Sequence, residues 1–221
     1  MKQVLSLILL AVSLTSCVDE DIVSPSWNED SFEPINSLQP FSEVIPAYDF
    51  DYWELVHHVD QKDFVQFGNG SICKDAEDPL LCASQFYQIE ISQLNDERPL
   101  TQNNGGDNYY YLRSNEQGYN KYWHSREEIS AFLGAIDSKG DALLIAAFNG
   151  YFFEKEDTSS SGIRQDEKNY HIIALKVVSR CSPYQVNKVL LEVDQNARLK
   201  ILDERIHAID AHACLDDQKN E

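Results

Sequence analysis

The chain has 221 residues, of which 43% are hydrophobic and 11% aromatic, so it can bury the core of a single folded domain. It carries 18 basic and 37 acidic residues, a formal net charge of −19 at neutral pH. A field of this sign repels phosphate backbones, so nucleic acid is not expected as a partner. Most of the charge is expected to form a solvated and self-repelling exterior.

The first segment of the chain has the features of a secretory signal peptide. Lys2 supplies a positive start, residues 4–12 form a mostly apolar stretch, and small or polar residues follow at 13–16. The apolar stretch is too short for a transmembrane helix, which needs about 20 apolar residues. Residues 1–16 are therefore expected to be a signal peptide that is removed.

The residues around the expected cleavage site, Leu14-Thr15-Ser16-Cys17, resemble the lipobox of bacterial lipoproteins. This resemblance implies that the Cys17 sulfur carries diacylglycerol, that cleavage occurs just before Cys17, and that its new amine is acylated too. Several acyl chains would anchor the protein to a lipid bilayer, since each buried methylene contributes about 0.8 kcal/mol. Val18 follows Cys17 directly. In many Gram-negative bacteria, lipoproteins that are retained in the inner membrane resemble one another in having Asp at this position. An outer-membrane location, on the periplasmic face or at the cell surface, is thus favoured.

The cysteine count agrees with an envelope protein. Five cysteines occur in the chain, and removing the lipidated Cys17 leaves an even four, as expected of disulfides in an oxidising compartment. Of the three possible pairings, the simplest joins Cys73 to Cys82 and Cys181 to Cys214.

A metal site near the C-terminus is the competing explanation for the last cysteine. His207 and His212 lie close to Cys214 in the sequence, but the paired short spacings of zinc sites are absent. We therefore expect no metal ligands and no cofactor.

The mature chain divides by composition into a tether, a domain and a tail. Residues 17–46 hold the lipidated cysteine and four of the seven prolines among acidic and polar residues, which predicts an extended tether. Residues 47–215 are expected to form one domain, and residues 216–221 a polar tail. At the start of the domain, the mixed apolar spacing of residues 51–67 allows either a short helix or a strand.

Two helices and a hairpin are predicted in the first half of the domain. Asp78 and Pro79 have the residue types of a helix start, and the apolar spacing continues to residue 94. Residues 109–112 and 119–123 favour an antiparallel hairpin. The next helix is predicted from a capping box, Ser125 with Glu128, and ends at Gly134.

Further strands are predicted in the second half. The almost wholly apolar stretch 141–153 is expected to be the buried core strand, followed by a solvated loop at 154–165. Three more strand candidates lie at residues 170–178, 186–193 and 199–202. The predicted fold class is α+β, an antiparallel sheet of five or six strands with two or three helices packed on one face.

The pattern of apolar and acidic residues at 128–145, with Cys181 before a hairpin and Cys214 after it, resembles certain uncharacterised bacterial envelope lipoproteins. This resemblance implies the same fold and the Cys181–Cys214 pairing. It implies no catalytic activity.

An aromatic stripe on the predicted hairpin is the candidate binding face. Aromatic rings offer a large contact area for a sugar or a partner protein, although alternation along a strand would bury half of them. The residues of this candidate face are Tyr109, Tyr111, Tyr122 and Trp123.

No local motif predicts catalysis. His57 and His58 lie among carboxylates, as in any chain this acidic, and residues 159–162 lack the pattern of a hydrolase nucleophile. Gly105-Gly106 does not lead into a helix, as a phosphate-binding loop would.

Two functions are compatible with these patterns. We expect a membrane-anchored envelope lipoprotein with a non-enzymatic binding or structural role, and a protein or glycan partner. The alternative is an envelope hydrolase or glycan-processing enzyme assembled from scattered Asp, Glu and His. Paired carboxylates about 5 to 10 Å apart in a cleft would favour the enzyme, and a flat aromatic patch would favour binding.

The anchor can be tested by removing the lipidated thiol. Cys17→Ser should abolish acylation and move the protein from the membrane fraction to the soluble fraction, because diacylglycerol attaches to the Cys17 sulfur. Fractionation together with intact-mass measurement of the mature chain checks this. A variant that still sediments with membranes would contradict the lipid anchor.

Overall fold

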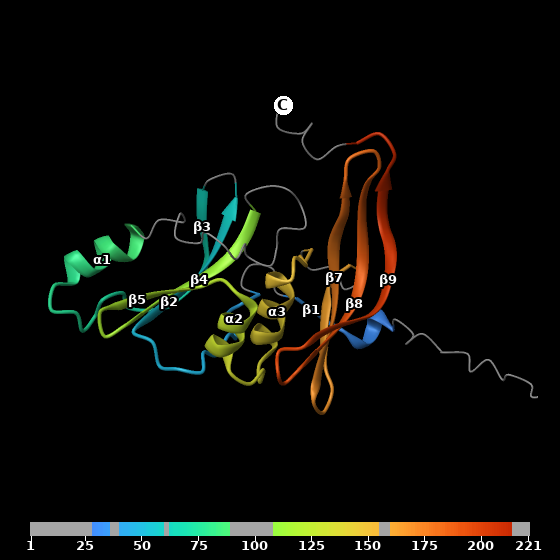
Figure 1. Cartoon of the computed structure of the whole chain (residues 1–221). Coiled ribbons are helices and arrows are strands. Elements are labelled where there is room, and N and C mark those ends of the chain that lie inside the picture. The colour runs from blue at the N-terminus through green and yellow to red at the C-terminus, as the bar shows by residue number, and fades with distance from the viewer. Residues whose placement is uncertain (1–27, 36–39, 60–61, 89–107, 155–159, 214–221) are drawn as a thin grey trace, which may run out of the picture.

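The computed structural model describes residues 28–35, 40–59, 62–88, 108–154 and 160–213. They form two antiparallel sheets, one of five strands in the order β1-β6-β7-β8-β9 and one of four strands in the order β3-β2-β4-β5. Figure 1 shows the helices α2 and α3 between the two sheets. The predicted α+β class with a five-stranded antiparallel sheet is confirmed, and the second sheet is an addition to it.

The elements follow one another in a simple order along the chain. They are η1 (Glu29–Ser31), β1 (Glu33–Pro34), β2 (Tyr52–Val59), β3 (Lys62–Gly70), α1 (Pro79–Gln88), β4 (Asn108–Glu116), β5 (Tyr119–Trp123), α2 (Arg126–Leu133), α3 (Lys139–Phe148), β6 (Gly162–Gln165), β7 (Asn169–Arg180), β8 (Tyr184–Asp194) and β9 (Leu199–Asp210).

Helix α3 is mostly apolar and is buried between the sheets. Every residue from Gly140 to Phe148 is buried, and the helix contacts β4 of one sheet and β7 and β8 of the other. The predicted core strand at 141–153 is therefore wrong. A uniformly apolar run has no period that separates a buried helix from a buried strand. The deciding local signal is a second capping box, formed by Ser138 and Asp141.

The Asp141 carboxylate also holds the segment 40–46 against α3. Its Oδ1 accepts a hydrogen bond from the Ile45 N–H at 2.9 Å, and its Oδ2 accepts one from the Ser138 N–H at 3.1 Å. Gly140 permits this close approach, since a Cβ atom there would lie 2.5 Å from the Val44 nitrogen. Asp141 is fully buried, so these bonds are shielded from competing water.

Within the expected tether, residues 17–46, the described segments 28–35 and 40–46 pack into the domain. The tether's strand β1 pairs with β6, with Glu33 opposite Ile163. Four apolar side chains of these segments are buried: Phe32, Ile35, Phe41 and Val44. The core thus begins before the expected boundary at residue 47. Proline content marks irregular backbone, but it does not reveal that the apolar residues between the prolines are buried.

The four-stranded sheet contains the region whose secondary structure was left open. Residues 51–67 lie mostly in the antiparallel pair β2 and β3. The predicted hairpin is confirmed as β4 and β5, with Leu112 opposite Trp123.

The predicted helix starts are also confirmed. The Asp78 Oδ1 atom accepts hydrogen bonds from the N–H groups of Leu80 and Leu81, and α1 begins at Pro79. Residues 89–94 of this predicted helix lie outside the described residues. The α2 capping box forms as expected, and Gly134 is the C-cap at a positive φ of 69°.

Strands β7, β8 and β9 make a long antiparallel arm that includes the three predicted strands. The strand β9 continues to Asp210, well beyond the predicted end at Leu202. Its register against β8 skips Leu202 and His207, and these bulges interrupt the alternation that marks a strand in the sequence. The short strand β6 lies inside the region 154–165, which was expected to be a loop.

One of the two predicted disulfide bonds lies wholly within the described residues, and it is confirmed. Cys73 and Cys82 form a disulfide that joins the turn after β3 to the first turn of α1, as predicted. Cys181 is also disulfide-bonded. Its expected partner, Cys214, lies outside the described residues, so that pairing stays a prediction.

The signal segment 1–16 and Cys17 also lie outside the described residues. None of the helices that the structure describes is long and apolar enough to cross a membrane. Lipid anchoring stays a prediction from the sequence.

The contact between Asp141 and Ile45 predicts unequal effects at two otherwise similar capping boxes. Asp141→Ala should lower the free energy of unfolding by about 3 kcal/mol, because it removes a cap and leaves buried backbone N–H groups without acceptors. The matched variant Glu128→Ala, at the same position of the α2 box, should cost only about 1 kcal/mol. Urea denaturation of both variants measures the difference, and equal losses would contradict the tertiary role of Asp141.

Candidate functional site

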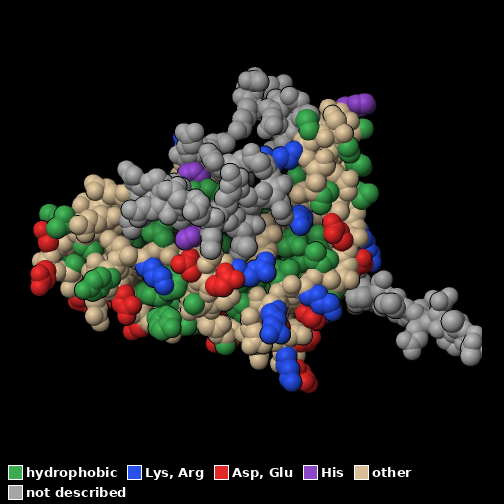
Figure 2. Space-filling model, viewed as in Figure 1, with side chains coloured by type: hydrophobic (Ala, Val, Ile, Leu, Met, Phe, Trp, Pro, Cys, Tyr) green, Lys and Arg blue, Asp and Glu red, His purple; other side chains and the backbone are tan. Residues whose placement is uncertain are grey.

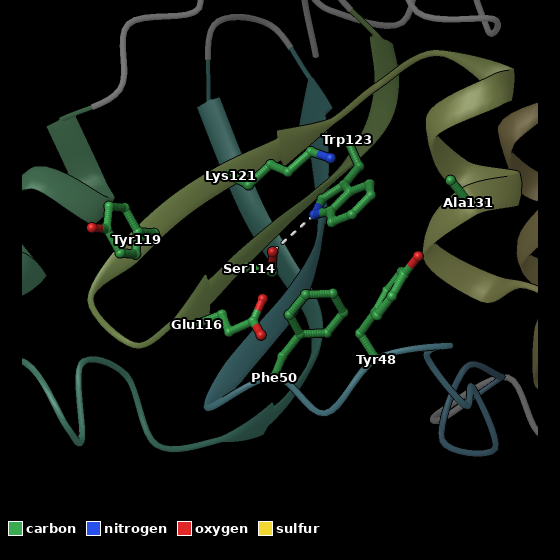
Figure 3. A pocket seen from close by; sticks show the side chains of 8 residues that line it. All are labelled: Tyr48, Phe50, Ser114, Glu116, Tyr119, Lys121, Trp123 and Ala131. Carbon is green, nitrogen blue, oxygen red and sulfur yellow. Dashed lines mark hydrogen bonds between the residues drawn. The ribbon is translucent and has the colours of Figure 1, made fainter.

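An open groove of about 330 Å³ lies beside the hairpin of β4 and β5. Figure 3 shows that its walls come from three places: the segment before β2, the hairpin itself, and helix α2. The lining residues are Tyr48, Phe50, Ser114, Glu116, Tyr119, Lys121, Trp123 and Ala131.

The indole of Trp123 forms part of the groove wall and is rigidly held. Its Nε1–H donates to the Ser114 Oγ atom at 2.8 Å, and its side chain is almost completely buried. The ring of Phe50 meets it edge-on at 5.8 Å and stacks on Phe132 at 5.3 Å. Because these rings pack into the main core, the groove is preformed on a fixed aromatic base.

Two tyrosines stand at opposite ends of the groove in Figure 3. Tyr48 is 59% exposed and Tyr119 is 81% exposed, so both rings are available to a ligand. Large aromatic rings exposed at the rim of a groove offer contact area at small cost in conformational entropy.

The groove also carries one group of each charge. The Lys121 Nζ atom lies 3.5 Å from the centroid of the Trp123 ring, a cation–π contact that orients the ammonium along the groove. Glu116 is exposed in the groove beside Phe50 (Figure 3). The ion pairs among the described residues include neither Glu116 nor Lys121. A donor and an acceptor are therefore available next to flat apolar rings.

The candidate binding face predicted from the sequence is divided by the sheet. Trp123 faces the groove, whereas Tyr111 and Tyr122 stack on each other at 5.4 Å on the opposite face of the sheet. Tyr109 and Tyr111 are buried there. The four residues therefore do not form one surface. Strand alternation sends neighbouring residues to opposite faces, and the stripe spans both.

Sequence reasoning missed Tyr48, Phe50, Glu116 and Lys121, and it did not include Tyr119 in the candidate face. Tyr48 and Phe50 precede β2 without any periodic pattern, and they reach the hairpin only through the fold. A weak signal was available for Tyr119, because it shares the parity of Trp123 on one predicted strand.

The face of the four-stranded sheet that carries Tyr111 is organised around a buried guanidinium. Arg113 forms an ion pair with Glu54 and lies 4.0 Å from the Asp63 carboxylate. It also lies over the ring of Phe86 from α1, at 5.4 Å. Arg113 thereby joins the helix to the sheet.

Tyrosine hydroxyls complete this cluster. Tyr52 donates to Glu54 Oε2 and Tyr111 donates to Asp63 Oδ2, both at 2.6 Å. Burial, reinforced by these bonds to carboxylates, raises the pKa of both phenols above the ordinary value. Both hydroxyls thus remain protonated donors across the physiological pH range. The cluster is a structural network around Arg113, in which the buried Arg113 Nε atom has no hydrogen-bond partner among the described residues.

The carboxylates of this cluster do not have the arrangement of a hydrolytic pair. Glu54 and Asp63 both face Arg113, and Glu54 is 1% exposed, so the pair does not flank an open cleft. Of the two candidate histidines, His58 contacts Asp63 at 2.7 Å, while His57 stacks on Tyr110 and faces the other side of the sheet.

The remaining candidate residues do not converge on a site. Ser161 is buried and accepts a hydrogen bond from the Glu154 N–H, and His207 and His212 are exposed on and after β9. Residues 105 and 106 lie outside the described part of the chain. Within that part, no three His, Cys, Asp or Glu side chains are placed to hold a metal ion.

Comparison of the chain with protein-family models, curated proteins and solved structures finds no match. The groove is therefore interpreted from its own geometry.

The Arg113 cluster predicts an asymmetry between buried and exposed ion pairs. Arg113→Leu should lower the free energy of unfolding by about 3 to 5 kcal/mol, because it leaves the Glu54 carboxylate buried without a counter-ion. The double variant Arg113→Leu with Glu54→Leu should recover much of this loss. As a control, Lys139→Met breaks an exposed pair with Glu33 and should cost less than about 1 kcal/mol in the same urea titration. If the double variant is no more stable than Arg113→Leu, the loss of stability does not come from a buried Glu54 carboxylate without a counter-ion.

Proposed function

We propose that this protein is a lipid-anchored lipoprotein of the bacterial envelope that binds a glycan, without catalysis, in the groove beside β4 and β5. Three features of the sequence support the lipid anchor: the lipobox at Cys17, the even number of remaining cysteines, and the acidic, proline-rich segment that follows Cys17. Val18 supports delivery to the outer membrane. The lipid bilayer is then one partner, through acylated Cys17, and the glycan is the other.

The observation that carries the binding proposal is the combination of exposed rings and polar groups in one open groove. A sugar ring presents C–H groups on its faces and hydroxyls around its edge. Tyr48 and Tyr119 suit the faces, while the Glu116 carboxylate accepts and the Lys121 ammonium donates at the edge. Because the two exposed tyrosines stand at opposite ends of the open groove, it suits a chain of sugars passing between them.

The lining favours binding over hydrolysis. Glycoside hydrolysis generally takes two carboxyl groups on either side of the scissile bond, about 5 to 10 Å apart. Among the residues that line the groove, Glu116 is the single carboxylate. A glycan held there would be oriented without being cleaved.

Binding can be tested with the full-length chain in detergent micelles. Migration through native gels that contain a soluble β-glucan, α-glucan or galactomannan should be retarded by at least one of these polysaccharides. Tyr119→Ala and Tyr48→Ala should each weaken the retardation about fivefold, since each removes a ring contact worth about 1 kcal/mol. Glu116→Gln should also weaken it.

The matched control is Tyr87→Ala, which removes a tyrosine of similar exposure from α1, away from the groove. It should leave the migration unchanged. Equal effects of Tyr87→Ala and Tyr119→Ala, or no retardation by any of the polysaccharides, would contradict glycan binding in the groove. Release of reducing ends from a bound polysaccharide would instead support the enzyme alternative.

A further inference from the structure

The strand β9 exposes three isoleucines at the edge of the five-stranded sheet. Ile201, Ile206 and Ile209 are 44%, 61% and 58% exposed. Figure 2 shows hydrophobic side chains gathered along the outer margin of the arm that β7, β8 and β9 form in Figure 1. Large apolar side chains that recur along one strand suggest a surface that another chain covers.

The backbone of this strand is equally open. β9 is the last strand of its sheet, so one row of its N–H and C=O groups has no partner strand in the described part of the chain. The register against β8 places all three isoleucines on one face: Ile201 lies opposite Leu191, Ile206 opposite Asn187 and Ile209 opposite Gln185. The edge therefore offers a ladder of hydrogen bonds with an apolar stripe beside it.

We propose that β9 pairs antiparallel with β9 of a second copy of this chain, across a two-fold axis at Arg205. This register sets Ile201 of each copy opposite Ile209 of the other. It also sets Lys200 opposite Asp210, on the other face of the sheet. An apolar pair and an opposite-charge pair thus form on each side of the axis, while Ile206 of each copy lies opposite Glu204 of the other. The two ends of the paired segment are therefore complementary to each other.

The charges at the axis are compatible with this pairing. The two Arg205 side chains would meet there, but each guanidinium already donates to its own Asp203, from Nε at 3.0 Å and from Nη2 at 2.8 Å. The strand has two cationic residues against three acidic ones, whereas the whole chain carries a net charge of −19. Repulsion between distant charges is screened beyond about 8 Å at physiological salt. The electrostatic energy of pairing is therefore set mainly by the opposing residues along β9.

The two bulges of β9 do not break the symmetry. Residues 202 and 207 are the ones skipped in the register against β8. If residues 202 and 207 are also left out of the pairing with the second copy, Ala208 lies opposite Asp203. Ile209 then still lies opposite Ile201, and Asp210 opposite Lys200. The side chains of each opposing pair then lie on the same face of the sheet.

Disulfide cross-linking tests this register in the full-length chain within envelope membranes. The double variant I201C with I209C should give a covalent dimer on non-reducing electrophoresis under mild oxidation, because the two thiols face each other twice across the axis. The single variants I201C and I209C are the controls. Each should migrate as a monomer on the same gel, because its thiol faces an isoleucine and forms no covalent cross-link. A monomeric double variant, a dimer of a single variant, or a cross-link to a different protein would each overturn the proposal.

Charge exchange provides a second test that depends on no engineered thiol. K200D and D210K should each weaken the dimer about tenfold in sedimentation velocity of the detergent-solubilised chain, because each puts like charges opposite one another. Combining K200D with D210K should restore the wild-type dimer. A double variant as weak as the singles would overturn this register, and a wild-type chain that sediments as a monomer at every concentration would overturn the dimer itself.

Discussion

The burial of α3 from Gly140 to Phe148 is the constraint on which the rest of this structure depends. A helix that is apolar on nearly every side must be covered on every side. The four-stranded sheet covers one side and the five-stranded sheet the other, so the two sheets share one core through this helix. The segment 40–46 closes a remaining side, and Asp141 holds it there through the Ile45 N–H. Segments far apart in the sequence thus pack around one helix and form a single hydrophobic core.

The hairpin of β4 and β5 separates a structural face from the face of the proposed binding groove. On one face Arg113 joins α1, β2 and β3 through two carboxylates and a set of rings. On the other face Ser114, Lys121 and Trp123 line an open groove. Because side chains alternate along a strand, a stable polar network and an exposed site are built from adjacent residues of the same two strands.

The proposed anchor, groove and dimer fit one physical picture. A protein held at a bilayer by acyl chains has a high local concentration in two dimensions, which favours pairing of copies through a short strand edge. Two copies would present two grooves on one assembly, and a polymeric glycan that reaches both would bind more tightly than to either alone. Weak sugar contacts in an open groove would gain most from such pairing.

Short-range patterns in the sequence predict the signal segment, and they determined the helix caps at Asp78 and Ser125, the β4–β5 hairpin and the Cys73–Cys82 pair. Each is decided by residues within about ten positions of one another, through capping hydrogen bonds, strand alternation or a short disulfide loop. Tertiary structure decided three things: that residues 139–148 are a helix, that residues 28–35 and 40–46 join the core, and that Tyr48 and Phe50 meet Trp123 in a groove. A uniformly apolar run has no period to identify it, and contacts between distant segments leave no local pattern. The capping box at Ser138 and Asp141 marks where the helix starts, whereas burial between two sheets decides the conformation of the apolar run that follows. Packing of the whole chain creates the other two arrangements.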